Sequence, residues 1–157
     1  MNTIWASNIH SRQKSRGRYL ITALKLLVYF IMISLQELKG LSVSVDHVAY
    51  QAGIYTNPEK PHCFAYYITI INRSNIAVTI RGRKWVLRNG RGEINAVEGE
   101  GIVGKCPKLN PGDLFNYNSF HLLETEAGVA EGAYLAVDSD GNPSIVRIPK
   151  FELSIPM

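Results

Sequence analysis

From Leu41 onward, apolar residues recur at every second position, and this period of two is the feature that most limits the folds open to the chain. Val43 and Val45 alternate with serines, which is the pattern of a strand with one buried face. The alternation changes phase near Asp46-His47, where an extra residue indicates a β-bulge. No amphipathic helix of useful length follows Gly40, so the pattern argues against an α/β fold and predicts an all-β one.

Turn-forming residues divide this part of the chain into about seven short strands. Asn89-Gly90 is the strongest hairpin signal, and Pro111-Gly112 marks another turn. Seven short strands at this spacing are typical of an immunoglobulin-like or fibronectin type III-like β-sandwich. The expected strands are Leu41–Tyr50, Cys63–Ile71, Val78–Leu87, Glu93–Glu98, Leu114–Ser119, Val129–Val137 and Ile145–Leu153.

Two of these strands have an unusual composition. Cys63–Ile71 is almost continuously aromatic and β-branched, which predicts a central strand covered on both faces. Glu131-Gly132-Ala133-Tyr134 places small residues inside a strand, which suits either close backbone packing or the addition of a partner strand.

The first forty residues differ from the rest in charge. The chain has 17 Lys and Arg and 13 Asp and Glu, a net charge of +4. Five of the basic residues and none of the acidic ones lie in residues 1–31, so residues 32–157 hold 12 basic and 13 acidic residues, a net of −1. The net positive charge therefore belongs to the N-terminal residues and not to the β-domain. The composition gives no support for nucleic-acid binding through a basic surface of that domain.

We divide the chain into an N-terminal basic and apolar extension, residues 1–40, and a β-sandwich domain, residues 41–157. Residues 19–35 form an apolar run that falls at the short end of the length needed for a membrane span, and Lys25 adds about 2.5–3.5 kcal/mol to the cost of inserting it. The run also has the basic and apolar regions of a signal peptide, without a small-x-small cleavage site. A third interpretation, which we prefer, is that Met32 is the working start and that the preceding residues are an upstream extension.

The residue types that carry chemistry do not form an arrangement expected of an enzyme. Cys63 and Cys106 have no metal-site spacing; we expect two free thiols and leave a single bridge open. The four histidines have no ligand spacing, and His121 lacks a fitting acid for a catalytic triad. Asp138-Ser139-Asp140-Gly141-Asn142 begins like a calcium loop, but position 149 is proline where that loop needs glutamate, so we expect a hairpin turn. We predict no catalytic residue, metal or cofactor.

A formal G-x-G-x-x-G motif spans residues 99–104. A dinucleotide fold needs a helix after this motif, but prolines follow closely at 107 and 111. Successive backbone N–H groups can also hold an anion without a helix, an arrangement that nearby lysines favour and Glu98 and Glu100 oppose. The main alternative is a tight loop that needs glycine dihedral angles. The candidate ligand-binding residues are Gly99, Gly101, Gly104 and Lys105.

A second candidate site is the segment Arg81-Gly82-Arg83-Lys84-Trp85, which mixes cations with an aromatic residue, as binding surfaces often do. We expect Arg81, Arg83 and Lys84 to face solvent or a protein partner, and Trp85 to lie in the core. These three cations are the candidate partner-binding residues.

Taken together, several ordered motifs between Leu41 and Leu153 resemble those of the ApaG family. Members usually begin just before the first strand, a further argument for Met32 as the start. The motifs that carry the resemblance are Phe64-Ala65-Tyr66-Tyr67-Ile68-Thr69-Ile70, Arg83-Lys84-Trp85, Val97-Glu98-Gly99-Glu100-Gly101-Ile102-Val103-Gly104, Leu109-Asn110-Pro111-Gly112, Glu131-Gly132-Ala133-Tyr134 and Ile148-Pro149-Lys150-Phe151.

The resemblance implies a fibronectin-like β-sandwich and a binding role. Bacterial members are small cytoplasmic proteins, named for a gene near diadenosine tetraphosphate hydrolase and loosely linked to cobalt and magnesium efflux. Eukaryotic relatives occur in F-box proteins and in a polymerase-delta-interacting protein, where the domain is taken to bind other proteins. The family has no established catalytic residues, and its glycine motif, here Gly99, Gly101 and Gly104, has been compared with pyrophosphate-binding sequences.

We therefore expect a non-catalytic protein-interaction module of unknown partner. The alternative is a sensor of nucleotide, pyrophosphate or diadenosine polyphosphate that uses the glycine loop, and divalent-metal handling ranks last. The expected location is the cytoplasm, or the membrane if residues 19–35 act as an anchor.

Overall fold

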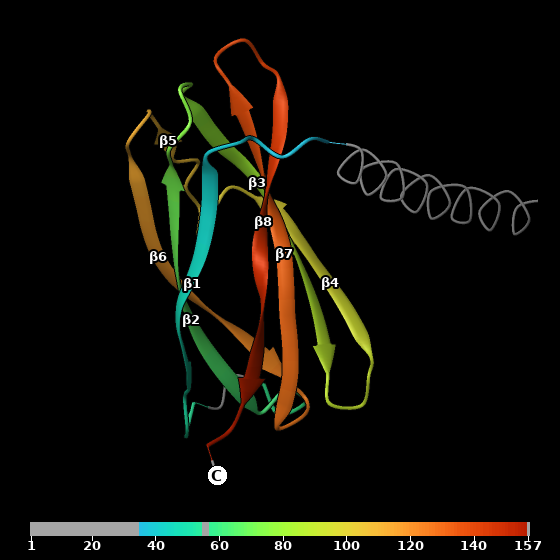
Figure 1. The fold of residues 1–157 in the computed structure, drawn as a ribbon. Coiled ribbons are helices and arrows are strands. Elements are labelled where there is room, and N and C mark those ends of the chain that lie inside the picture. Colours follow the sequence, from blue (N-terminus) through green and yellow to red (C-terminus); the bar gives the residue numbers. More distant parts are fainter. Residues whose placement is uncertain (1–34, 55–56, 157) are drawn as a thin grey trace, which may run out of the picture. The chain divides into compact units, whose positions relative to one another are not determined.

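Two antiparallel sheets face each other in the computed structural model, which describes residues 35–54 and 57–156 (Figure 1). Within those residues the chain forms eight strands, one more than predicted. No helix in the described part is long and apolar enough to span a membrane. The strands are β1 (Leu41–Tyr50), β2 (His62–Asn72), β3 (Val78–Asn89), β4 (Ile94–Glu100), β5 (Lys108–Leu109), β6 (Leu114–Leu123), β7 (Ala127–Asp138) and β8 (Pro143–Ser154).

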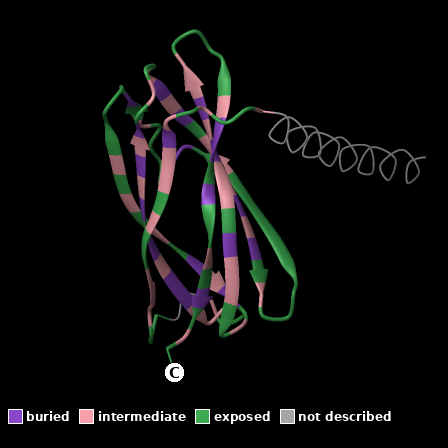
Figure 2. Ribbon diagram, in the orientation of Figure 1, coloured by how far each residue is buried: buried purple, intermediate pink, exposed green. Residues whose placement is uncertain are grey.

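One sheet has the order β1-β2-β6 and the other the order β4-β3-β7-β8, with the short β5 also paired to β3. All neighbouring strands run antiparallel. Figure 2 shows that the buried residues recur along the strands, as expected when each sheet buries one face against the other. The predicted all-β sandwich is confirmed. The predictions of a signal peptide and of a start at Met32 lie outside the described residues, as does the predicted anchor over residues 19–35 apart from its last residue, Leu35.

The folded unit begins at Gln36, before the predicted boundary at Leu41. The segment ahead of β1 pairs with the start of β8, because Leu38 N–H donates to Ile145 O (3.3 Å) and Ile145 N–H donates to Gln36 O (3.1 Å). These backbone bonds extend the sheet beyond β8. They also cover part of an edge that would otherwise be open.

β1 carries the predicted bulge, since its register with β2 shifts between Val45 and His47. β2 is central in its sheet, but the prediction that both of its faces are covered is wrong. Alternate residues from Phe64 to Ile70 are at most 3% exposed, whereas Tyr67 on the opposite face is 40% exposed. The outward positions hold aromatic and β-branched residues too, so composition alone did not distinguish the two faces.

The predicted turns are present. Asn89-Gly90 starts the β3–β4 hairpin, although the loop is longer than two residues and Gly92, with φ +81°, is its left-handed residue. Asn89 Oδ1 accepts the N–H groups of Arg91 and Glu93, each at 3.0 Å. The residues from 138 to 142 form the predicted hairpin turn between β7 and β8.

Both cysteines have free thiols, as expected. Cys63 is buried and Cys106 is exposed.

Gly132 lies in β7 close against the backbone of β3. A Cβ at this position would collide with the carbonyl oxygen of Lys84 and press on Ile148 Cδ1 at 3.2 Å. The predicted close backbone packing is therefore confirmed. The alternative, that this segment accepts a partner strand, is wrong, because β7 already pairs with β3 on one side and with β8 on the other.

The core is centred on an aromatic cluster that spans both sheets. Trp85 is 2% exposed, which confirms its predicted core position, and its ring centroid lies 4.7 Å from that of His121 and 5.0 Å from that of Tyr66. His121 is 8% exposed, and its Nε2 has no hydrogen-bond partner among the described residues. Burial lowers the pKa of His121 from 6.5 to about 4, because the charged imidazolium would lose its hydration.

This buried histidine predicts a loss of stability in mild acid. Between pH 6.5 and about 4 the unfolded chain binds a proton at His121 that the folded chain does not, so stability falls as the pH falls through this range. We expect the free energy of unfolding to drop by about 3 kcal/mol over this range. Urea denaturation of the wild type and of His121→Phe at several pH values measures the effect. An equal slope in the two proteins would contradict the assignment to His121.

Candidate functional site

The β3–β4 hairpin provides the most accessible strand of the described molecule. β4 is the terminal strand of its sheet, and every residue in it except Gly99 is exposed (Figure 2). Ile94 is 59% exposed and Val97 is 41% exposed, although these two residues lie on opposite faces of the strand. An edge strand of this kind offers unpaired backbone groups together with apolar side chains.

The hydrogen bonds at the two ends of the hairpin show which residues of β4 have backbone groups on the free side. Asn89 N–H donates to Glu93 O (3.0 Å), and Gly101 N–H donates to Arg81 O (2.9 Å), in one continuous register. Because bonded and non-bonded pairs alternate in an antiparallel ladder, the residues between them with odd numbers bond to β3. The N–H and C=O groups that point to the free edge therefore belong to Ile94, Ala96, Glu98 and Glu100. The Glu100 carbonyl already accepts from Arg83 Nη1 (2.8 Å), so at this end only the Glu100 N–H is open to a partner.

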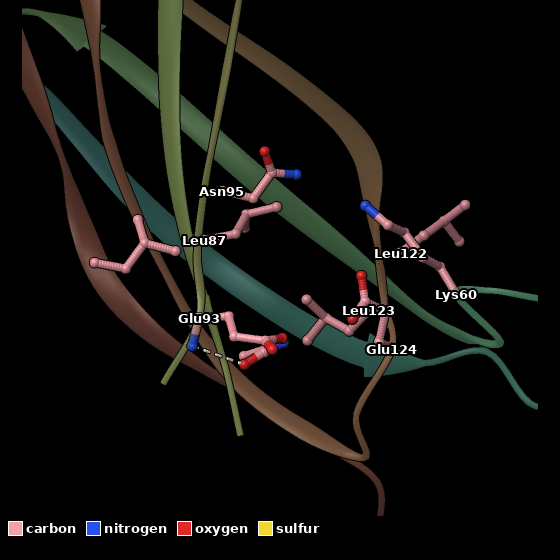
Figure 3. Close-up of a pocket in the computed structure, with 9 residues that line it drawn as sticks. Lys60, Leu87, Glu93, Asn95, Leu122, Leu123 and Glu124 are labelled. Atoms are coloured by element: carbon pink, nitrogen blue, oxygen red, sulfur yellow. Dashed lines mark hydrogen bonds between the residues drawn. The ribbon is translucent and has the colours of Figure 1, made fainter. Parts of the chain in front are cut away.

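A pocket of about 280 Å³ lies where β4 begins, between this hairpin and the end of β6 (Figure 3). Leucine side chains from β3 and β6 contribute apolar surface, and charged groups from the β1–β2, β3–β4 and β6–β7 loops contribute polar surface. Its lining residues are Lys60, Leu87, Asn89, Glu93, Ile94, Asn95, Leu122, Leu123 and Glu124.

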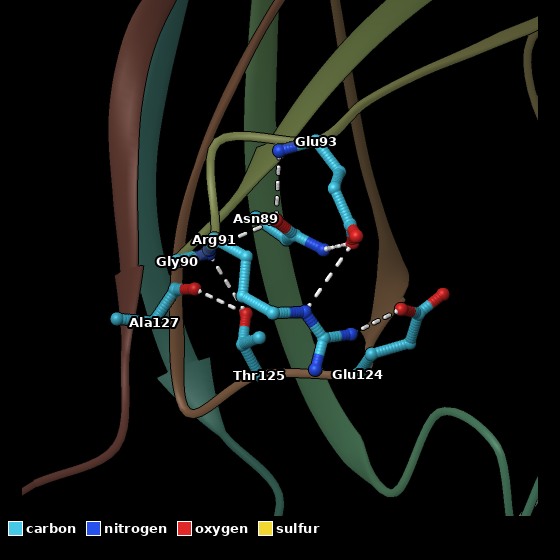
Figure 4. Close-up of polar contacts among 7 residues, drawn as sticks. All are labelled: Asn89, Gly90, Arg91, Glu93, Glu124, Thr125 and Ala127. Atoms are coloured by element: carbon cyan, nitrogen blue, oxygen red, sulfur yellow. Dashed lines mark hydrogen bonds and ion pairs between the residues drawn. The ribbon is translucent and has the colours of Figure 1, made fainter.

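A polar network holds the hairpin tip against the β6–β7 loop (Figure 4). The Arg91 guanidinium lies 2.7 Å from Glu124 Oε2 and 3.4 Å from Glu93 Oε2. Gly90 N–H donates to Thr125 Oγ1 (2.9 Å), and this hydroxyl donates to the carbonyl of Ala127 (2.7 Å). The ion pairs are exposed, and each stabilises the fold little. Together these contacts attach the tip of the β3–β4 hairpin to the β6–β7 loop.

The glycine motif forms a tight turn at the far end of β4. Ile102 and Lys105 bond to each other in both directions, N–H to O at 2.7 and 2.9 Å. The two residues between them, Val103 and Gly104, have φ +47° and +74°, which defines a type I′ turn. Ile102 is fully buried and holds the turn to the core, while Val103 is 58% exposed at its tip.

The structure places three of the predicted ligand residues, Gly101, Gly104 and Lys105, in one loop, and the fourth, Gly99, near the end of β4. Several N–H groups of this loop already bond within the chain. The N–H groups of Gly101, Ile102 and Lys105 already bond to carbonyls of the fold. Arg83 Nη1 donates to the carbonyls of Glu100 (2.8 Å) and Gly101 (3.0 Å), and its guanidinium lies against Gly99. The turn leads into β5 and not into a helix. Anion binding by Gly99, Gly101, Gly104 and Lys105 stays a prediction.

The three predicted partner-binding cations differ in position. Arg81 is exposed, whereas Lys84 lies 2.8 Å from Glu98 Oε1 with its side chain only 12% exposed. Arg83 is half-buried: a bulge between Ile80 and Gly82 puts it on the same face as Trp85, beside the glycine loop. Whether these cations bind a partner stays a prediction, with two of them engaged in contacts inside the chain.

Near Arg83 lies a pair of tyrosines that the sequence did not reveal, Tyr134 fully buried and Tyr117 partly buried. The hydroxyl groups of Tyr117 (β6) and Tyr134 (β7) hydrogen-bond to each other across the two sheets. Burial raises the pKa of both phenols, and the nearby Arg83 charge lowers it by a smaller amount. Both hydroxyls are therefore neutral, and they join the sheets instead of acting as nucleophiles. No group of three or more His, Cys, Asp or Glu side chains gathers as a metal site in the described part of the chain.

The chain is similar to a protein-family model, to proteins of known sequence and to solved structures. The ApaG domain family model matches residues 55–138. Protein ApaG of Shewanella pealeana is 43% identical over 116 residues, which cover 73% of this chain and 92% of that protein. Protein ApaG of Azoarcus sp. strain BH72 is 40% identical over 115 residues, which cover 73% and 91%. A crystal structure of a Bordetella pertussis protein designated ApaA has a TM-score of 0.68 at 31% identity, covering 78% of this chain and 98% of that one.

Two glycines of the loop differ in what a side chain would meet. A Cβ on Gly101 would collide with the carbonyl oxygen of Lys105, whereas a Cβ on Gly104 would meet no atom within 4 Å. We expect Gly101→Ala to lower the free energy of unfolding by about 3 kcal/mol, from the collision and the left-handed φ together. Gly104→Ala should lower it by about 1 kcal/mol, from φ alone. Urea denaturation of both variants tests this order; equal losses would contradict it.

Val103 is a β-branched residue in a left-handed conformation, which costs free energy in the folded state. Asparagine is the preferred residue before glycine in a type I′ turn. We therefore expect Val103→Asn to raise the free energy of unfolding by about 1 kcal/mol. Val103→Thr, which keeps the branched Cβ, is the control. Thermal and urea unfolding measure the change, and a gain of the same size in Val103→Thr would show that backbone strain is not its cause.

Proposed function

The chain belongs to the ApaG domain family, and from that membership we propose that it is a non-catalytic protein-interaction module. An extended segment of a partner protein pairs with the free edge of β4 in this proposal. The observation that carries it is the row of outward backbone groups at Ile94, Ala96 and Glu98, continued by the N–H of Glu100, on a strand exposed on both faces. Strand addition of this kind draws its affinity from backbone hydrogen bonds and its specificity from pockets for alternate side chains.

The other sheet edges suit a partner strand less well. β1 is interrupted by the bulge between Val45 and His47. β8 contains Pro149, and the segment from Gln36 to Leu38 pairs with its start. β6 packs its inner face on the core, so an added strand would gain contacts on one face only. β4 has none of these restrictions, and natural edge strands that must stay unpaired usually carry such features.

The pocket beside β4 supports the same proposal. It lies next to Ile94 and Asn95, so a strand beside β4 would carry one of its side chains close to the pocket. Leu87 and Ile94 offer it apolar surface, while Lys60, Glu93 and Glu124 surround it with charges of both signs. A partner segment with apolar residues at alternate positions fits this edge best, with one long side chain directed into the pocket.

Sensing of nucleotide or pyrophosphate by the glycine loop remains the second candidate. Two features make it weaker than strand addition. Three loop N–H groups already bond within the chain, and the nearby carboxylates of Glu98 and Glu100 oppose an anion. The link to cobalt and magnesium efflux and the cytoplasmic location are proposals that rest on the family resemblance alone.

A proline in β4 tests the proposal directly. Ala96 N–H points away from β3, so Ala96→Pro removes one outward donor and leaves the β3–β4 ladder intact. We expect capture of protein partners from native lysate on the immobilised chain to fall at least about tenfold in Ala96→Pro, which corresponds to one or two lost backbone hydrogen bonds. The control Ala96→Ser keeps the N–H and should capture partners as the wild type does.

Hydrogen exchange on the captured complex supplies the second measurement. A strand on β4 should slow exchange at the amides of Ile94, Ala96, Glu98 and Glu100. Partners retained equally by Ala96→Pro, or protection on other strands only, would refute strand addition at β4. Substitution of Arg83 or Gly101 is less informative, because both residues hold the loop together.

A further inference from the structure

The outer face of the β1-β2-β6 sheet carries a pocket, lined by both polar and aromatic side chains, that the strand-addition proposal does not use. Its volume is about 460 Å³, within the range of small-molecule sites. It lies on the side of the sheet away from the core, and residues from all three strands line it. The lining side chains on the outer face are Asp46, His47, Tyr67, Thr69, Asn116 and Asn118.

Strand register places these side chains in two adjacent rows. Ser44, Thr69 and Asn116 lie side by side across the three strands, and the next row is His47, Tyr67 and Asn118. Asp46 is the extra residue of the β1 bulge, and its carboxylate lies among these rows. Bulges often redirect a side chain beside a functional site, and here the bulge adds an acceptor to the face.

Hydrogen bonds hold the polar groups in position before any ligand arrives. Asp46 accepts from Thr69 Oγ1 (2.6 Å) and from Ser44 Oγ (2.7 Å), and these two bonds lower the pKa of its carboxyl. Asn116 Oδ1 lies 2.8 Å from the same Thr69 oxygen. The His47 and Tyr67 rings lie 5.7 Å apart, with Tyr67 40% exposed. A fixed set of groups loses little conformational freedom on binding.

The chemistry of the lining identifies the class of ligand. Amides and a hydroxyl provide both donors and acceptors, and the carboxylate provides acceptors only. This mixture matches neighbouring hydroxyl groups, each of which donates and accepts. An exposed tyrosine ring offers an apolar surface to the C–H groups of a sugar ring. The lining contains neither Lys nor Arg, and the Asp46 charge repels anions, so a phosphate does not fit.

We propose that the outer face of the β1-β2-β6 sheet binds a neutral saccharide of one or two rings, held by Asp46, Asn116 and Asn118 against Tyr67. This site is separate from the β4 edge, so either site can fail without the other.

Two-dimensional ¹H–¹⁵N NMR on the full chain tests the site. The probes are glucose, galactose, mannose, N-acetylglucosamine and maltose, each at about 10 mM, which would nearly saturate a site with a Kd near 1 mM. At least one probe should shift the side-chain amide signals of Asn116 and Asn118 in a saturable way. Glucose 6-phosphate should bind more weakly than glucose because of the Asp46 carboxylate.

Matched variants locate the binding on this face. Asn118→Ala and Tyr67→Ala should each raise the Kd about tenfold, since each removes one anchoring contact. Leu114→Ala, on the same face of β6 but outside the pocket, should change the Kd less than about twofold. Asn118 is exposed, so its variant remains informative if Tyr67→Ala does not fold. No saturable shift with any probe, shifts confined to other strands, or tighter binding of the phosphorylated sugar would overturn the proposal.

Discussion

The packing of aromatic rings around Trp85 joins the two sheets and fixes the position of β3, on which the rest of the sandwich depends. Rings from β2, β6 and β8 surround this indole, with centroids between 4.7 and 5.9 Å away. Such pairs stabilise by about 0.5–1.5 kcal/mol each beyond the burial of their surface. β3 in turn pairs with β4, β5 and β7, so the strand that holds the indole also positions the free edge and the glycine loop.

Bulges then decide what each face presents. On β1, the extra residue Asp46 adds a carboxylate to the outer face, where alternation alone would supply one side chain for every two residues. On β3, the shift between Ile80 and Gly82 has the opposite effect and turns Arg83 toward the inner side, where it binds two carbonyls of the glycine loop. The β1 bulge therefore contributes a carboxylate to a candidate binding surface. The β3 bulge directs Arg83 to hydrogen bonds within the chain.

This difference explains how far the sequence could predict the molecule. The β1 bulge is visible because valines on both sides of Asp46 mark the change of phase. The β3 bulge also changes the phase of the apolar residues, from Val78 and Ile80 to Trp85 and Leu87. The polar segment between them does not show where the extra residue lies, and Arg83 was expected to face solvent or a partner. The strands themselves follow from alternation, but the accessible edge of β4 depends on which strand ends the sheet. Pairing order is a long-range property that local periodicity does not contain.

The glycine motif shows why a short pattern can match two unrelated chemistries. In a dinucleotide fold the glycines allow a phosphate to approach a helix N-terminus. Here Gly101 is required because its own chain, at the carbonyl of Lys105, occupies the space of a side chain, and Gly104 is required by the left-handed second position of the turn. The fold thus accounts for both glycines without a ligand. The family motif can therefore be explained by the need to form the turn after β4 as well as by phosphate binding. The motif by itself is weak support for phosphate binding.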